Sequence, residues 1–130
     1  MLMDTLSKDF KRFAAHLRIE AVALAGLMTA LTYKSGTPLW VLPATFIFFD
    51  IGMIGYIVSA RVGALTYNLI HNSTIPTILI IYGALNNAHA ISVIAYAWTF
   101  HIAIDRMLGF GLKHKKSFHH THLGKIGNKS

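Results

Sequence analysis

Five ionisable side chains lie within stretches of the sequence that are otherwise apolar, and their types are those of metal ligands. These side chains belong to Glu20, Asp50, His71, His101 and Asp105. Imidazole nitrogens and carboxylate oxygens together form a good ligand set for zinc, iron or manganese. His101 and Asp105 are four residues apart, which places both side chains on one face of a helix. The pattern therefore predicts a centre for a divalent transition metal, with one ion or two.

The segments that must position these residues are long and apolar. Hydrophobic residues make up 54% of the 130 residues and charged residues 13%, which is about half of the charged share in a soluble domain. A helix needs about 20 apolar residues to cross a bilayer. The sequence predicts four such helices, at residues 17–34, 38–60, 62–83 and 87–110. Because the connections between them are short, we expect an all-α up-down bundle of four transmembrane helices.

The basic residues predict how this bundle is oriented. The chain has 12 Lys and Arg residues, and in the predicted topology all of them except Lys34 lie on one side. That side is cytoplasmic by the positive-inside rule, so both termini are expected in the cytoplasm. Residues 1–16 have an amphipathic pattern that fits a short helix on the inner leaflet or a solvated extension of the first span. Residues 111–130 form a basic, histidine-rich tail.

The five ionisable residues share a depth in the predicted bundle. At 1.5 Å per residue, Asp50, His71 and His101 lie about 10–15 Å from the cytoplasmic boundary, and Glu20 and Asp105 lie nearer to it. An ionisable side chain in hydrocarbon costs at least about 2.5–3.5 kcal/mol, so it usually faces the bundle interior and has a partner. We therefore expect the five side chains to share one pocket in the cytoplasmic half.

Each of these residues has a role in the metal-centre interpretation and a plainer structural one. We predict Asp50, His71, His101 and Asp105 as metal ligands and Glu20 as a further ligand or general base. In the structural alternative, His101 and Asp105 form a hydrogen-bonded pair that closes the bundle, and Glu20 is solvated near the interface.

Polar residues around the ligand set complete the predicted pocket. The residues assigned to substrate binding are Arg61, Tyr67 and Asn68. Tyr67 and Asn68 extend the polar face of His71 by one turn. Arg61 either caps the helical face of Asp50 at the cytoplasmic mouth of the pocket or forms an ion pair with the Asp50 carboxylate. Arg106 is assigned to catalysis together with Glu20.

The tail holds a histidine tract with two interpretations. Its histidines are His114, His119, His120 and His122. In a flexible tail such a tract more often binds metal weakly and incidentally. Alternatively, His122 folds back over the pocket and completes the ligand set. The composition of the tail leaves both interpretations open.

The expected function is that of a metal-dependent membrane enzyme. It would be a hydrolase or an oxidoreductase that acts on a lipid or another amphipathic substrate from the cytoplasmic leaflet. An alternative is a proton or cation channel or transporter that uses the same buried residues. A third alternative is a structural or partner-binding protein, and assembly into homo-oligomers is compatible with all three.

Two compositional features exclude other classes of site. The chain has no cysteine, which rules out a thiolate metal site and a cysteine nucleophile. The net charge of +7 follows from the basic cytoplasmic side, and no recognition motif for nucleic acid accompanies it. Nucleic acid is therefore not expected as a partner.

Five stretches carry a family resemblance. They read LRIE at 17–20, FDIGMIGY at 49–56, RVGALTYNLIH at 61–71, HIAIDRMLGFGLK at 101–113 and FHHTHLG at 118–124. Together they resemble a bacterial family of small integral membrane proteins classed as a domain of unknown function. The resemblance implies a location in the bacterial inner membrane and a polar signature. That signature consists of Glu20, Asp50, Asn68, His71, His101, Asp105, Arg106 and His122.

Overall fold

The computed structural model describes residues 1–109, 113–114, 117–121 and 124–125, and the side chains of residues 1–109. Its helical elements are α1 (Leu2–Lys34), α2 (Val41–Ala44), α3 (Phe46–Phe49), the 3-10 helix η1 (Asp50–Ile57), α4 (Ala60–His71), α5 (Thr74–Asn86) and α6 (His89–Met107). Short connections join these elements, so the all-α prediction is confirmed for residues 1–109.

The longest element, α1, is one uninterrupted helix. Its 33 residues make it about 50 Å long. It includes both residues 2–16 and the first predicted span, which favours an extension of the first helix over a separate helix on the membrane surface. In the part of the chain that the structure describes, α1 is the one helix that is both long and apolar enough to cross a membrane.

The other predicted spans are less regular than the sequence suggests, and four continuous membrane helices are not confirmed. The second predicted span is divided among α2, α3 and η1, and the third is divided between α4 and α5. The fourth corresponds to α6, whose histidines and terminal charged residues lower its mean hydropathy. Val41–Ile57 is apolar but shorter than a full span.

Pro76 explains why the third predicted span divides. In a continuous helix the Pro76 ring would clash with the carbonyl group of Asn72. Pro76 also has no backbone N–H that could donate a hydrogen bond to that carbonyl. Instead, Asn72 has an extended backbone, with φ −86° and ψ 132°. Its side-chain oxygen accepts a hydrogen bond of 2.8 Å from the backbone N–H of Thr74. Because α5 begins at Thr74, Pro76 falls in the first turn, where its missing N–H is tolerated.

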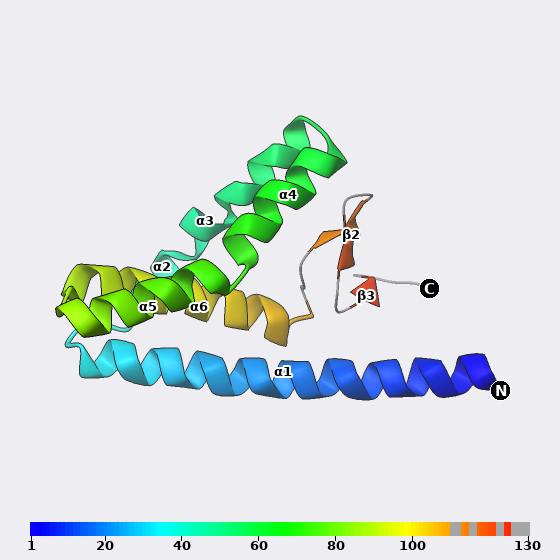
Figure 1. Ribbon diagram of the computed structural model, residues 1–130, viewed down its shortest axis with the longest axis horizontal. Helices are drawn as coiled ribbons and strands as arrows, with labels where there is room; N and C mark the ends of the chain where they lie inside the picture. Colours follow the sequence, from blue (N-terminus) through cyan, green and yellow to red (C-terminus); the bar gives the residue numbers. More distant parts are fainter. Residues whose placement is uncertain (110–112, 115–116, 122–123, 126–130) are drawn as a thin grey trace.

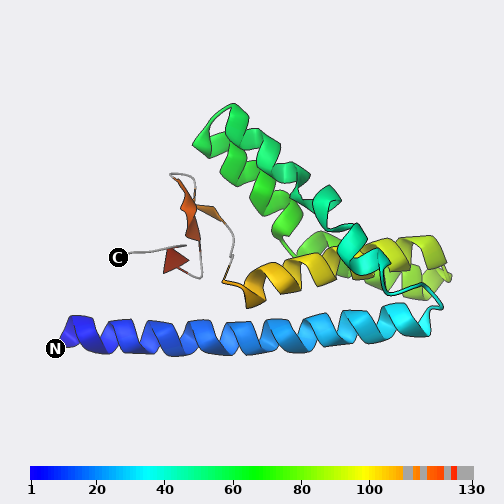
Figure 2. The ribbon, with the colours of Figure 1, turned by 180° about the vertical axis from the view of Figure 1, so that it is seen from behind.

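The helices form two packed groups. α6 packs against α1 and α5, whereas η1 packs against α4. In Figure 1, α5 and α6 lie along the C-terminal half of α1, and α4 leans away from them together with η1. The view from behind in Figure 2 shows that the N-terminal half of α1 extends past α6. The two groups meet where α4 ends beside α6.

Small residues allow η1 and α4 to approach closely. A Cβ atom at Gly63 would overlap the ring of Tyr56, and one at Gly52 would lie 3.0 Å from the carbonyl oxygen of Thr66. The Thr66 hydroxyl donates a hydrogen bond of 2.5 Å to the carbonyl oxygen of Gly52. This packing brings Asp50, the first residue of η1, beside the last turn of α4.

A small antiparallel sheet follows the helices. Its strands are β1 (Lys113–His114), β2 (Ser117–Thr121) and β3 (Gly124–Lys125), in the order β1-β2-β3. β1 and β2 lie beside α4. The sequence does not predict this sheet, because strands of two to five residues carry too little alternation of apolar and polar residues to be recognised.

Candidate metal centre

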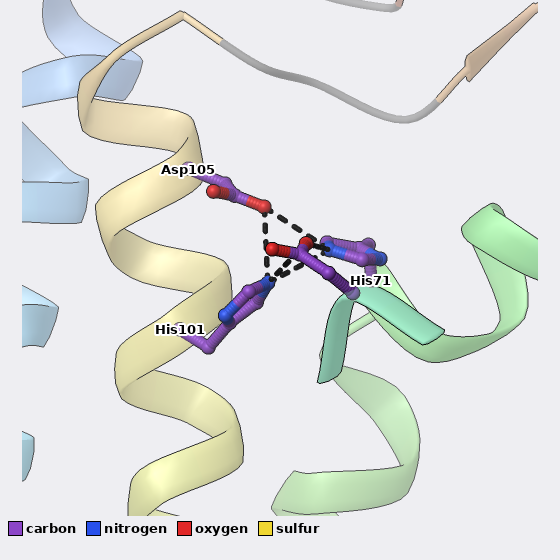
Figure 3. Close-up of side chains that lie close together, drawn as sticks. His71, His101 and Asp105 are labelled. Carbon is purple, nitrogen blue, oxygen red and sulfur yellow. Dashed lines mark hydrogen bonds and ion pairs between the residues drawn. The ribbon is translucent and has the colours of Figure 1, made fainter. Parts of the chain in front are cut away.

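Four of the predicted ligands meet where the two helical groups join. Asp50 begins η1, His71 ends α4, and His101 and Asp105 lie on α6. Each offers one ligand atom, and these four atoms all lie within 4.8 Å of one another. Figure 3 shows the two imidazole rings pointing toward each other, with Asp105 one turn along α6. The predicted convergence of these four side chains is therefore present in the fold.

The distances within this cluster are short and similar. The Nε2 atoms of His71 and His101 are 2.9 Å apart. An oxygen of Asp105 lies 3.0 Å from the Nε2 of His71 and 3.2 Å from that of His101. An oxygen of Asp50 lies 3.6 Å and 3.2 Å from the same two nitrogens.

These separations fit a tetrahedral ion. Ligands that lie about 2.0–2.1 Å from a tetrahedral zinc ion are about 3.3–3.4 Å from one another. Five of the six separations among the four ligand atoms, from 2.9 to 3.6 Å, lie on both sides of that value. The sixth, between the two carboxylate oxygens, is bounded only by the 4.8 Å within which all four atoms lie, so a carboxylate would have to move for all four donors to bind one ion.

The backbone of α4 fixes the orientation of the His71 ring. Its Nδ1 lies 3.0 Å from the carbonyl oxygen of Tyr67. Because a carbonyl oxygen only accepts, Nδ1 must be the donor, and the Nε2 of a neutral ring presents its lone pair to the cluster. The Tyr67 ring also stacks on the His71 ring, with centroids 3.7 Å apart and planes 6° apart. An outer hydrogen bond of this kind is typical of metal-binding histidines.

The cluster places electron-rich atoms face to face. The Nε2 lone pair of a neutral His71 faces the Nε2 of His101 and the oxygens of two carboxylates. At separations near 3 Å these atoms repel one another unless a cation or a shared proton lies among them. The donor set therefore fits a metal ion. The plainer alternative is a protonated histidine bound between Asp50 and Asp105.

The cluster is buried at its histidines and open at one carboxylate. The side chains of His71 and His101 are 3% and 1% exposed, whereas those of Asp105 and Asp50 are 14% and 42% exposed. Phe46 packs against the His101 ring, with centroids 4.1 Å apart. Access from outside is therefore on the side of Asp50.

Trp98 of α6 contacts both α4 and the last residue of α3, which directly precedes η1. Its Nε1–H donates a hydrogen bond of 2.6 Å to the carbonyl oxygen of Ile70, the residue before His71. Its ring stacks on Phe49, the residue before Asp50, with centroids 5.6 Å apart. We did not single out this residue from the sequence, although it lies three residues before His101 and so on the same side of α6.

The two predicted catalytic residues, Glu20 and Arg106, differ in their distance from the cluster along the fold: Glu20 lies outside it and Arg106 lies next to one of its members. Glu20 is exposed on α1 and is not part of the cluster. The residues of α1 that are buried are Ala21, Ala25, Met28 and Thr32. Glu20 lies about 100° around the helix from Ala21 and therefore points away from that stripe. Arg106, by contrast, follows Asp105 directly and is half-buried.

The predicted substrate-binding residues are also separated. The Tyr67 hydroxyl donates a long hydrogen bond of 3.4 Å to Asp105, and Asn68 is partly buried on the same helix. Arg61 is exposed in the first turn of α4, about 15 Å along that helix from His71. The predicted helical face that joins Asp50 to Arg61 does not form, because η1 ends at Ile57 and the chain then turns.

The sequence predicts that His122 in the tail completes the ligand set. His122 lies outside the described residues, so its prediction as a ligand stays a prediction. The backbone of β2 ends at Thr121, just before it.

Most of the chain resembles one protein family in sequence. No curated protein and no solved structure matches the chain detectably. The profile of the family described as Domain of unknown function (DUF4260) matches residues 14–126, which include all four residues of the cluster. This match confirms the predicted resemblance to a domain of unknown function, and the chain belongs to that family.

Proposed function

We propose that the chain is an integral membrane metalloenzyme. Asp50, His71, His101 and Asp105 bind a divalent transition metal, and the substrate is a lipid or another amphipathic molecule that enters from the cytoplasmic leaflet. The single observation that carries this proposal is the convergence of four ligand atoms within 4.8 Å. A bound cation would balance the two carboxylates that lie around the two buried imidazole rings.

The surface of the described helices supports a location in lipid. Large apolar side chains are exposed on several elements, among them Ile47 at 75%, Phe48 at 68% and Leu85 at 77%. Exposed apolar area on this scale is typical of a surface covered by lipid or by another protein. The 19 residues of α6 span about 28 Å, close to the roughly 30 Å of a hydrocarbon core. We infer that the other three predicted spans accompany α1 across the bilayer.

The open carboxylate supports a catalytic centre over a purely structural one. A structural zinc site is closed, whereas a catalytic site keeps one position for water or substrate. Asp50 is the most exposed ligand, so this is where a substrate atom can approach. A metal ion bound here would polarise a substrate oxygen or activate a water molecule. The choice between hydrolysis and oxidation depends on which metal is bound.

Metal analysis of the full chain, purified in detergent, tests this proposal. We expect about one zinc, iron or manganese ion per chain in the wild type, since four donors suffice for one tetrahedral site. His101→Ala should lose most of that metal. His89→Ala is the matched control, because His89 lies on the same helix and is exposed outside the cluster.

The histidine tract requires a second control. A variant that combines His114→Ala, His119→Ala and His120→Ala removes three tail histidines and leaves the cluster intact. The proposal predicts that this variant keeps its tightly bound metal. Wild-type protein with little metal, or equal metal in the wild type and His101→Ala, would overturn the proposal.

A second candidate function uses the same cluster to conduct protons or cations. The observation that favours it is the Nδ1 atom of His101, which is buried and has no hydrogen-bond partner among the described residues. A ring with one free nitrogen can exchange protons between two sides. Flux into liposomes that disappears in Asp50→Asn, with no bound metal in the wild type, would favour transport over catalysis.

A further inference from the structure

Two arginines from different helices lie at the C-terminal end of α6. Arg106 is in the last turn of α6. Arg18, on α1, places its guanidinium against Gly109, where an added Cβ atom would lie 2.7 Å from Nη2. The backbone N–H of Gly109 donates a hydrogen bond of 3.0 Å to the carbonyl oxygen of Arg106. The Arg18 guanidinium therefore lies at the end of the helical turn that Arg106 begins.

Arg106 is placed beside the candidate metal centre by its position in the chain. It follows Asp105 directly and is half-buried in the last turn of α6. An oxygen of the Asp105 carboxylate lies 3.0 Å and 3.2 Å from the Nε2 atoms of His71 and His101.

Neither arginine has an anionic partner in the described part of the chain. Its ion pairs join Asp50 and Asp105 to the histidines and Asp4 to the N-terminus. Glu20 follows Arg18 by two residues, and side chains at that spacing do not face each other on a helix. Arg18 is exposed, but Arg106 is half-buried, and a half-buried guanidinium without an anion is unfavourable. The missing charge can therefore come from a ligand.

A simpler role for the two arginines would be to stabilise the C-terminal end of α6. Cations are favourable there because the last carbonyl groups of a helix carry partial negative charge. A side chain in that role usually donates a hydrogen bond to one of those carbonyls. Among the described residues, neither guanidinium donates such a bond to α6. The helix terminus alone therefore does not account for both arginines.

We propose that Arg106 and Arg18 together bind the phosphate group of an amphipathic substrate beside the metal centre. The planar guanidinium matches phosphate oxygens in pairs. The inference rests on the proposed function, because Arg106 directly follows Asp105, one of the proposed metal ligands. It narrows the substrate class from any amphipathic molecule to one that carries phosphate.

Binding of a short-chain phosphatidic acid to the full chain in detergent tests this inference. Isothermal titration calorimetry with dihexanoyl phosphatidic acid should show binding to the wild type, and dihexanoyl glycerol, which lacks the phosphate, should not bind. Arg106→Gln and Arg18→Gln should each weaken binding about tenfold, the effect of losing one charged hydrogen bond. Arg106→Lys keeps the charge but loses the paired geometry, so a smaller loss is expected.

Arg12→Gln is the matched control, because Arg12 is exposed on α1 and belongs to neither site. Equal weakening in Arg12→Gln would show a general effect of charge and would overturn the inference. Unchanged binding in the double variant of Arg18 and Arg106 would also overturn it. Inorganic phosphate serves as a second probe: arginine-dependent binding of both probes supports recognition of phosphate itself, and binding of phosphatidic acid alone supports recognition of a lipid headgroup.

Metal content separates this inference from the proposed function. The arginine variants should keep their metal, since neither residue belongs to the ligand set. If the wild type holds metal but does not bind phosphatidic acid or phosphate, the inference fails and the metal centre stands. If the wild type holds no metal but shows arginine-dependent binding, the proposed function fails and the phosphate site stands.

Discussion

The Nδ1 atom of His71 lies 3.0 Å from the carbonyl oxygen of Tyr67, one turn earlier in α4. This contact keeps the hydrogen on Nδ1 and directs the lone pair of Nε2 toward the α6 residues. It does so at the last residue of α4, where the helix ends and the backbone turns at Asn72. The orientation of the His71 ring is therefore fixed by contacts within α4 and does not depend on α6.

Removal of metal should lower the thermal stability of the protein. The ligands come from η1, α4 and α6, so a bound ion would add a further link between elements that are joined by packing and a few hydrogen bonds. At a free metal concentration of 100 times Kd, binding stabilises the folded state by about 2.7 kcal/mol. Differential scanning fluorimetry in detergent should therefore show a lower Tm after chelation.

The matched control for this effect is His101→Ala, whose Tm should not respond to the chelator. A chelator effect of the same size in His101→Ala would place the metal elsewhere. No change of Tm in wild-type protein that has demonstrably lost metal would contradict a metal that holds these elements together.

Trp98→Phe should weaken metal binding without unfolding the protein. The variant keeps an aromatic ring to stack on Phe49 but loses the hydrogen bond to the carbonyl oxygen of Ile70. Because that bond holds the end of α4 against α6, we expect a loss of affinity of about 10–100-fold, as for other supporting residues of metal sites. Competition with a chromophoric chelator would measure the affinity.

The spectrum of the Co²⁺-substituted protein gives a second readout of Trp98→Phe. A shift of its visible bands would report a change in ligand geometry, which a merely structural role would not produce. Tyr96→Phe, which removes a polar atom from another aromatic residue of α6, serves as control. Equal affinity and identical spectra in Trp98→Phe and wild type would show that Trp98 does not position the site.

Gly63→Ala should destabilise the fold. An added Cβ atom would overlap the ring of Tyr56, where η1 and α4 are in close contact. Such overpacking typically costs about 1–3 kcal/mol. Gly26→Ala is the matched control, because nothing lies within 4 Å of a Cβ atom added there, and an alanine in a helix interior is favoured by about 0.5–1 kcal/mol. The denaturant concentration at the midpoint of unfolding should fall in Gly63→Ala and rise in Gly26→Ala.

A cysteine-free chain makes the membrane orientation directly measurable. In Ser7→Cys and Lys34→Cys, each introduced thiol is the single cysteine of the protein. If α1 crosses the membrane with its N-terminus in the cytoplasm, an impermeant maleimide added outside intact cells should label position 34 and not position 7. Both positions should react after lysis. Labelling of both or neither in intact cells would contradict the crossing of α1.

Much of the local structure could be predicted from the sequence. His101 and Asp105 share a face because helical periodicity alone places residues four apart on one side. The apolar segments and the division of the chain into helical regions follow from composition and breaker residues in the same way. The position of Pro76 already implied a break before Thr74, although the prediction of a continuous third span overlooked it.

Only the tertiary structure decided which polar residues meet. Asp50 and His71 are brought together by the close contact of η1 with α4, and both reach α6 through the packing around Trp98. Glu20 is left outside because the rotation of α1 about its axis is set by which stripe packs on α6. The sequence determines the period of each helix, but its rotation and register against its neighbours depend on contacts between residues far apart in the chain. For that reason the residue types predicted a metal centre, and only the packing decided which four side chains meet.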